Sequence, residues 1–344
     1  MVRSSLTLFK LFLLASIMFR EGFVCAQGSQ SDNNQALTET ERNIRIDPEL
    51  RPPENIKYTF KRNEKVEEVI DHDLGVQRIL KREPVYQSFF LFGDYGYYHT
   101  DNPLLLETGN KQDDSFRVGR LGGSFLPKIN EQLYGEVTLS YQWFRYDENW
   151  EVLDFDSLNV GGGLTWLLPD IPNLSLGVRY NYNLLRAGSD REPPTDPREN
   201  TVKFGEEIFL SHSFSATIQY VVPLSKAHYT YLGYSNELLW TDDADETKVL
   251  YSIFTGYGAN ITRNLSSSVY YKLSFVDYQF KTIPEDPTRR QDLRQNISLT
   301  LKYKFTEWLQ ANISSGWTFN HSNAAALDYE ALSLGANSGL ELRF

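Results

Sequence analysis

The sequence contains almost no cysteine or methionine and, beyond its N-terminus, no long apolar run. Among 344 residues there are two methionines and one cysteine, Cys25. No stretch after residue 26 approaches the roughly 18 apolar residues that a membrane-spanning helix needs. Membrane helices, disulfides and thiolate metal sites are therefore excluded beyond the leader. Membrane-spanning strands are not excluded, because each strand needs only one apolar face.

Basic residues are outnumbered by acidic ones, 34 to 45, which gives a formal net charge of −11. Removing residues 1–26 takes away Arg3, Lys10, Arg20 and Glu21, leaving 31 basic and 44 acidic residues and a net charge of −13. Binding to nucleic acid requires a basic surface that neutralises phosphates. We therefore expect no nucleic acid partner.

The N-terminus is typical of a secretory signal peptide. Basic residues flank an apolar core, Leu11–Phe19, and compact residues precede a cut after Ala26. We therefore predict a signal peptide over residues 1–26. Lipidation at Cys25 is the alternative, but bulky Phe23 fits a lipoprotein signal poorly.

Apolar and polar residues alternate with a period of two from Tyr86 to Phe344, as in strands with one apolar face. The polar positions are rich in Gly, Ser, Thr and Asn, which suits a water-facing lumen. A soluble β-sandwich also alternates, but here aromatic residues gather near the ends of the apolar faces, as interfacial girdles require. These residues are Tyr141, Trp143, Trp166, Tyr180, Tyr182, Tyr220, Trp240, Tyr303, Phe305, Trp317 and Phe319.

The strands and their connections follow a regular plan. Short connections alternate with longer, more charged ones such as Lys281–Asp292, which is the layout of an outer-membrane barrel. Residues 85–344 therefore predict an all-β fold, a transmembrane antiparallel up-and-down β-barrel of about 12 strands, in the outer membrane of a Gram-negative bacterium. The expected strands are 86–99, 115–126, 132–146, 153–167, 173–186, 206–222, 228–240, 247–261, 265–280, 293–305, 309–320 and 328–344.

Residues 27–84 form a polar segment rich in Asn, Glu, Arg, Asp and Pro, with too few apolar residues for a core. We expect a periplasmic tail here. Within it, Val66–Leu80 has apolar residues at loosely helical spacing. The alternative is that this segment acts as a plug or gate that enters the barrel.

Two short segments resemble known families. The final residues, Leu340-Glu341-Leu342-Arg343-Phe344, resemble the C-terminal assembly signal of bacterial outer-membrane barrels, carried by Leu340, Leu342 and Phe344. Tyr97–Pro103 resembles the start of some uncharacterised β-barrel porins. The resemblance implies the barrel-insertion machinery, outer-membrane lipid and lipopolysaccharide as partners, and it transfers no catalytic residue.

Charged residues on the polar face are the functional candidates. In a channel they would set ion preference and orient solutes; alternatively, they pair with one another and fill a narrow barrel. Both signs are present, so no strong preference for anions or cations follows. The candidates are Asp94, Arg120, Glu136, Arg179, Glu237, Lys272, Lys302, Lys304, Glu341 and Arg343.

Three functions fit this pattern, because twelve-stranded barrels resemble small channels, translocator domains and an outer-membrane phospholipase. The first hypothesis is a porin-like channel for passive passage of small solutes, with no cofactor or metal. The second is a plugged structural barrel associated with the envelope or with surface-polymer export. The third is a membrane-embedded hydrolase using His212, which Ser211 and Ser213 flank. Alternation places His212 on the outer face, which a phospholipase could use because its substrate is in the membrane. No local sequence resembles that family's motif, however, so we expect no enzyme.

Overall fold

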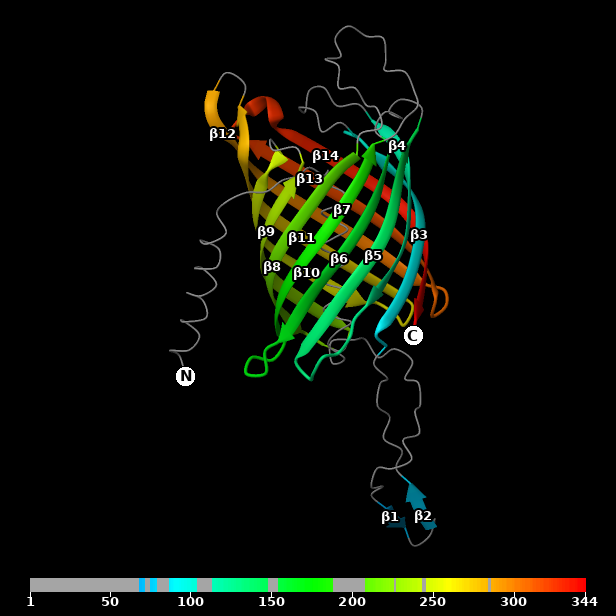
Figure 1. Ribbon diagram of the computed structural model, residues 1–344. Coiled ribbons are helices and arrows are strands. Elements are labelled where there is room, and N and C mark those ends of the chain that lie inside the picture. Colours follow the sequence, from blue (N-terminus) through cyan, green and yellow to red (C-terminus); the bar gives the residue numbers. More distant parts are fainter. Residues whose placement is uncertain are drawn as a thin grey trace.

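The computed structural model describes residues 68–71, 75–78, 87–103, 113–147, 154–187, 208–225, 227–242, 246–283 and 286–344. Twelve strands form a closed barrel in which each strand pairs antiparallel with its neighbours in the sequence, and β14 pairs with β3 (Figure 1). The strands are β3 (Phe89–Thr100), β4 (Asp114–Phe125), β5 (Leu133–Tyr146), β6 (Phe155–Leu167), β7 (Leu174–Ala187), β8 (Ile208–Pro223), β9 (His228–Thr241), β10 (Lys248–Asn260), β11 (Leu265–Ile283), β12 (Asp286–Lys304), β13 (Leu309–Ser322) and β14 (Tyr329–Arg343).

The predicted fold is confirmed, and each of the twelve expected strands corresponds to one barrel strand. The segment expected at 173–186, for example, is β7, Leu174–Ala187. The prediction succeeds because a barrel wall has two different environments, and successive side chains of a strand point alternately into each.

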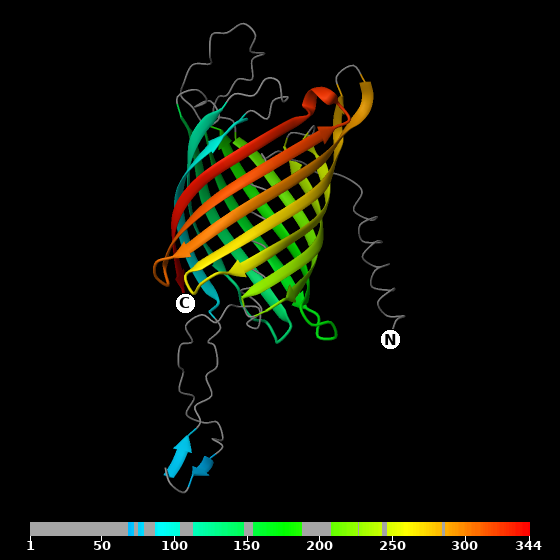
Figure 2. The same cartoon turned by 180° about the vertical axis from the view of Figure 1, so that it is seen from behind.

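The barrel closes where its first and last strands meet. The backbone N–H of Phe344 donates to the carbonyl of Phe89 at 2.9 Å, and the N–H of Phe89 donates back at 3.3 Å. Their rings lie 6.3 Å apart. The start of β3 and the end of β14 therefore lie at the same end of the barrel (Figure 2). Closure leaves no unpaired strand edge in the barrel wall, which lipid would not tolerate.

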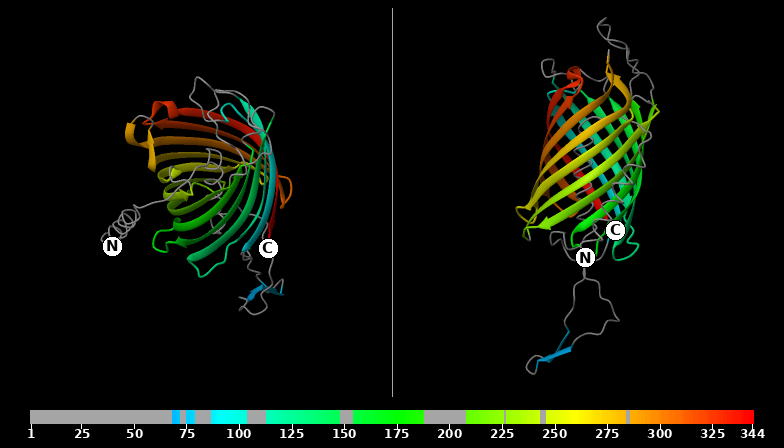
Figure 3. Two further views of the ribbon diagram at one scale, coloured as in Figure 1. Left: turned by 45° about the horizontal axis from the view of Figure 1, so that its top comes forward. Right: turned by 90° about the vertical axis from the view of Figure 1, so that its left-hand side faces the viewer.

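The two ends of the barrel differ (Figure 3, right). At the turn end, Thr262 and Thr306 each accept the backbone N–H of the residue three positions later, at 3.0 and 2.9 Å. At the opposite, loop end, β3, β5, β7, β9, β11 and β13 end, and β4, β6, β8, β10, β12 and β14 begin. The 3-10 helix η4 (Ala325–Leu327) lies there between β13 and β14. Within the described ranges, no helix is long and apolar enough to cross a membrane.

The connection predicted at Lys281–Asp292 is wrong. β11 continues to Ile283 and β12 begins at Asp286, so only two residues separate them. β12 pairs with β13 only from Asp292 onward, so this hairpin rises beyond the rim as a two-stranded ribbon (Figure 1). The prolines and charges of this segment are typical of a loop. A ribbon outside the wall needs no apolar face, so its sequence does not show the alternation that identifies the other strands.

Where the structure describes Val66–Leu80, the chain is extended, although the spacing of the apolar residues is loosely helical. The described part of this segment forms strands β1 (Glu68–Asp71) and β2 (Gly75–Arg78), a two-stranded sheet separate from the barrel. Val69, Ile70 and Val76 are β-branched residues, which favour an extended backbone. The predicted signal peptide and most of the polar segment lie outside the described residues.

The outer face of the barrel is apolar. Leu121, Ile253 and Leu334 are exposed by 57%, 55% and 56%. The aromatic residues predicted for the girdles lie at outer positions of their strands, except Phe305, which is exposed just after the end of β12. Such a continuous apolar surface around a closed barrel requires lipid.

Candidate functional site: the inner wall of the barrel

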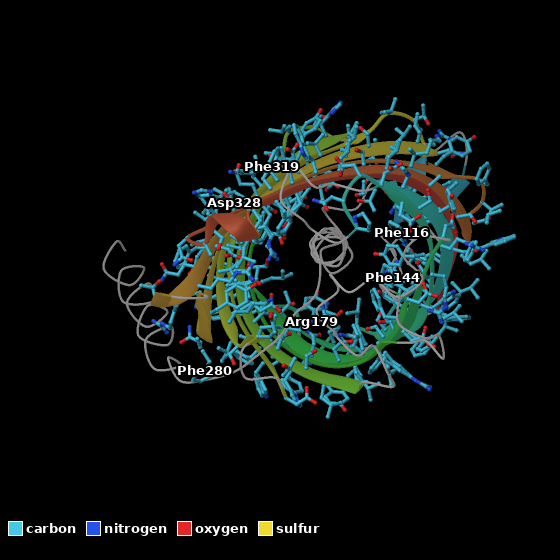
Figure 4. All side chains as sticks on the ribbon, turned by 90° about the horizontal axis from the view of Figure 1, so that it is seen from above. Phe116, Phe144, Arg179, Phe280, Phe319 and Asp328 are labelled. Atoms are coloured by element: carbon cyan, nitrogen blue, oxygen red, sulfur yellow. The ribbon has the colours of Figure 1, made fainter. Side chains whose placement is uncertain are left out.

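Every second residue of each strand lies on the inner face of the wall. Seen down the barrel, Phe116, Phe144 and Arg179 lie on the inner side of the wall, whereas Phe280 lies outside it (Figure 4). Phe116 and Phe144 are 0% and 7% exposed. These two inner rings are thus buried among other side chains, in contrast to the exposed residues of the outer face.

All ten charged candidates lie at inner positions of their strands. Six of them form three ion pairs: Asp94 with Arg120, Glu136 with Arg179, and Glu341 with Arg343. The remaining candidates are Glu237 on β9, Lys272 on β11, and Lys302 and Lys304 on β12. The sequence places these residues on one face but does not pair them.

The Glu136–Arg179 pair crosses an intervening strand. Arg179 lies on β7 and Glu136 on β5, with β6 between them, and their Nη2 and Oε1 atoms are 3.3 Å apart. Nη2 also donates to Oγ1 of Thr138 at 3.1 Å, and Nε donates to Oδ1 of Asn181 at 3.0 Å. Both charges are nearly buried, with side chains 8% and 15% exposed.

Two glycines of β6 make this crossing possible. Gly163 lies opposite both Glu136 and Arg179 in the sheet. A Cβ atom on Gly161 would lie 2.5 Å from Oδ1 of Asn181 and 2.7 Å from Oγ1 of Thr138. The lack of side chains at Gly161 and Gly163 therefore leaves a slot in the wall, which the guanidinium of Arg179 crosses.

Replacing Gly161 with alanine should disturb the contacts of Arg179 with Thr138 and Asn181. We expect a loss of about 1–2 kcal/mol in the free energy of unfolding, because each hydrogen bond contributes about 1 kcal/mol. Denaturant unfolding of the folded barrel, followed by tryptophan fluorescence, measures it. Gly162→Ala is the matched control, since its added Cβ would come no closer than 3.6 Å to the carbonyl oxygen of Glu136. Equal midpoints for the two variants would contradict the slot.

The other two pairs each include an aromatic ring. The guanidinium carbon of Arg120 lies 4.9 Å from the ring centroid of Phe92, and that of Arg343 lies 5.9 Å from the centroid of Phe90. Within the second pair, Nε of Arg343 donates to Oε1 of Glu341 at 2.7 Å. The three pairs draw on β14, β3, β4, β5 and β7, so they share one side of the wall.

An aromatic cluster inside the barrel was not predicted from the sequence, which placed aromatic residues only in outer girdles. Tyr98, Phe116, Phe144 and Phe155 lie on the successive strands β3 to β6 near the loop end. Successive ring centroids are 5.5, 6.3 and 4.3 Å apart. Alternation was the signal that could have identified two of them, because Tyr98 and Phe116 have the same parity as Asp94 and Arg120 on their own strands.

A second missed cluster surrounds Asp292 at the loop end. Asp292 is fully buried and accepts hydrogen bonds from Arg290 at 2.6 and 3.0 Å. The cations of Arg290 and Lys248 lie 4.6 and 5.1 Å from the ring of Tyr278. Assigning Arg290 and Asp292 to a loop concealed this cluster, because residues in a loop have no assigned face.

Neutral polar side chains cover the inner faces of β12 and β13. Several of their atoms are buried without a hydrogen-bond partner, which a protein interior rarely leaves. These atoms are Nδ2 of Asn296, Oγ of Ser298, Oγ1 of Thr300, and Oδ1 of Asn312 and Asn320. Water molecules buried within the wall would satisfy them.

His212 lies in an outer aromatic cluster. Its Nδ1 is 2.6 Å from the hydroxyl of Tyr180, and its ring stacks on Trp240 at 4.9 Å. Ser211 and Ser213 have the opposite parity, and Ser211 donates to the carbonyl of Asn183. Among the described residues, no serine hydroxyl is hydrogen-bonded to His212, so the Ser–His pair of a hydrolase is not assembled there. Within the same ranges, no group of three or more His, Cys, Asp or Glu residues could hold a metal ion.

Among known proteins, this chain is similar to solved structures. No protein-family model matches the chain, and no curated protein sequence matches it. The COG4313 outer membrane channel from Pseudomonas putida F1 is 16% identical, with a TM-score of 0.50 over 80% of this chain and 100% of that chain. The β domain of the Bordetella autotransporter BrkA is 10% identical, with a TM-score of 0.43 over 73% and 98% of the two chains. The first likeness shows that this chain has the fold of a bacterial outer-membrane β-barrel.

Proposed function

We propose that this protein is a porin-like channel of the outer membrane for passive passage of small solutes. The observation that carries the proposal is the contrast between the two faces of the closed wall. The outer face is apolar, whereas the inner face carries three ion pairs and a band of neutral polar side chains on β12 and β13. A polar inner wall suits water and dissolved solutes.

Single-channel recording tests this function. The refolded mature protein in planar bilayers is expected to give discrete, stable conductance steps in KCl. Heat-modifiable migration on gels shows beforehand that the barrel is folded. Silence from folded protein would contradict an open channel and favour a plugged structural barrel with a role in the envelope or in surface-polymer export.

Inner charges should set the ion preference of the channel. Replacing Lys302 with glutamate puts a negative charge on the inner face of β12, so the reversal potential in a KCl gradient is expected to shift towards greater cation permeability. Arg117→Glu is the control, since Arg117 lies on the outer face, 51% exposed beside Asp147. Equal shifts in both variants would show that the lumen does not select by these charges.

The remaining expectations extend this proposal. Leu340, Leu342 and Phe344 lie on the outer face, 48%, 46% and 63% exposed, where the insertion machinery could read them before β14 meets β3. We further propose residues 1–26 as the signal peptide, residues 27–84 as the periplasmic segment, and outer-membrane lipid with lipopolysaccharide as the surroundings of the barrel.

A further inference from the structure

The guanidinium of Arg120 is held against the inner wall by two neighbours. Oδ2 of Asp94 accepts from Nε at 2.8 Å and lies 2.7 Å from Nη2. The ring of Phe92 lies beneath the guanidinium, 4.9 Å from its carbon. These contacts leave the side chain of Arg120 31% exposed, so one edge of the cation is fixed while another still faces the lumen.

The ring of Phe92 packs in turn against the backbone of a glycine. Gly122 lies directly opposite Phe92 on β4, and a Cβ added there would come within 2.6 Å of Cζ of Phe92. The ring therefore occupies the space that a side chain at position 122 would fill. A planar cation stacked on a fixed ring loses little freedom when it binds a second anion.

The edge of the Arg120 guanidinium that faces away from Asp94 has N–H groups available for a further hydrogen bond. Asp94 contacts Nε and Nη2, and among the described residues Nη1 has no hydrogen-bond partner. Guanidinium groups present paired N–H donors that match the two oxygens of a carboxylate. Directly opposite Arg120 on β5 lies Gln142, whose amide offers further hydrogen bonds to the same group.

An apolar surface lies beside this donor. Towards the loop end, the inner positions of β4 pass from Arg120 to Val118 and then to Phe116, whose ring stacks on Tyr98 at 5.5 Å. Inner positions on one strand are roughly 7 Å apart. A solute with its carboxylate at Arg120 would therefore lay an aromatic or other apolar body along Val118 towards the ring of Tyr98.

We propose that Arg120, Asp94 and Phe92 form a carboxylate subsite, which binds small organic acids with an apolar body as they pass through the lumen. This proposal rests on the channel function and names its solute class. Asp94 repels an incoming carboxylate and keeps binding weak. Weak binding suits a channel, because the solute must leave as well as enter.

Binding to the folded, full-length mature protein in detergent micelles is the first test, and it does not require conduction. The probe is 4-fluorobenzoate, titrated and followed by ¹⁹F NMR, with 4-fluorobenzyl alcohol as its neutral counterpart. We expect Arg120→Gln to weaken binding of the acid about tenfold, as loss of a charge-assisted hydrogen bond does. Asp94→Asn should strengthen binding, and Arg120→Lys, which keeps the charge but loses the planar fork, should still weaken it.

Arg117→Gln is the matched control, because it removes a positive charge from the outer face of the same strand. It should bind 4-fluorobenzoate as the wild type does. No binding by the wild type, or equal binding in the Arg120→Gln, Asp94→Asn and wild-type proteins, would overturn the subsite. If Arg120→Gln does not fold, the opposite changes expected for Asp94→Asn and Arg120→Lys still decide the question.

Bilayer recording separates the subsite from the channel function. In KCl alone, conductance tests only the channel. Added benzoate should then interrupt the current of the wild type briefly, with longer interruptions for Asp94→Asn and fewer for Arg120→Gln. Conductance without these differences would overturn the subsite and leave the channel intact. Specific binding in micelles without conductance would contradict the channel alone.

Discussion

Replacing Glu136 with leucine is expected to lower the free energy of unfolding by about 3 kcal/mol, the lower part of the range for breaking a buried ion pair. The carboxylate lies 3.3 Å from Nη2 of Arg179, and both side chains are largely shielded from water. Leucine removes the negative charge and leaves the guanidinium without its acidic partner across β6. Denaturant unfolding in lipid vesicles, with tryptophan fluorescence as the signal, measures the loss.

A double-mutant cycle separates the pair from general packing. Glu136→Leu combined with Arg179→Leu removes both charges, so the double variant should be less destabilised than the two single variants predict together. Additive losses would mean that the two residues do not interact. In that case their shared slot over β6 would have only a steric role.

Replacing Leu299 with arginine should destabilise the barrel by about 2–4 kcal/mol, the cost of a cation on the lipid face at the bilayer midplane. Leu299 is 52% exposed on the outer face of β12. It lies near the middle of the part of β12 that pairs with β13, between Asp292 and Lys304. Reversible unfolding in lipid vesicles gives the value.

Replacing Phe305 with arginine should destabilise the barrel much less than the same change at Leu299, because Phe305 lies at a different depth in the membrane. This residue is 57% exposed and lies at the turn between β12 and β13. An arginine there should cost only about 0–1 kcal/mol, because its charge reaches the interfacial region. Similar losses at the two positions would contradict a lipid belt centred on Leu299.

The barrel strands could be predicted because the residues of each strand alternate between apolar and polar, as the two sides of the wall require. In the final strand, Leu340 and Leu342 alternate with Glu341 and Arg343, and β14 places the first pair outward and the second pair inward. This alternation is lost outside the wall, because side chains there do not point alternately into lipid and lumen. The ribbon above the rim was assigned to a loop for that reason.

The inner position of Arg179 could be predicted, but its partner could not. Alternation fixes the face of a side chain, whereas the partner depends on the register of two sheet pairings and on the lack of a side chain at Gly161 and Gly163. The inner aromatic residues were likewise not predicted from the sequence. Rings such as Phe116 suggested lipid from their composition, although their parity placed them inside.

The sequence by itself determined that this chain builds a closed antiparallel barrel with an apolar outside, because a period of two and the spacing of turns are local properties. Only the tertiary structure decided which inner residues act together. Arg120 meets Asp94 and Phe92, and Arg179 reaches Glu136 across β6, because strand register brings distant residues to the same height. The chemistry of the lumen arises from these long-range pairings, which no single strand contains.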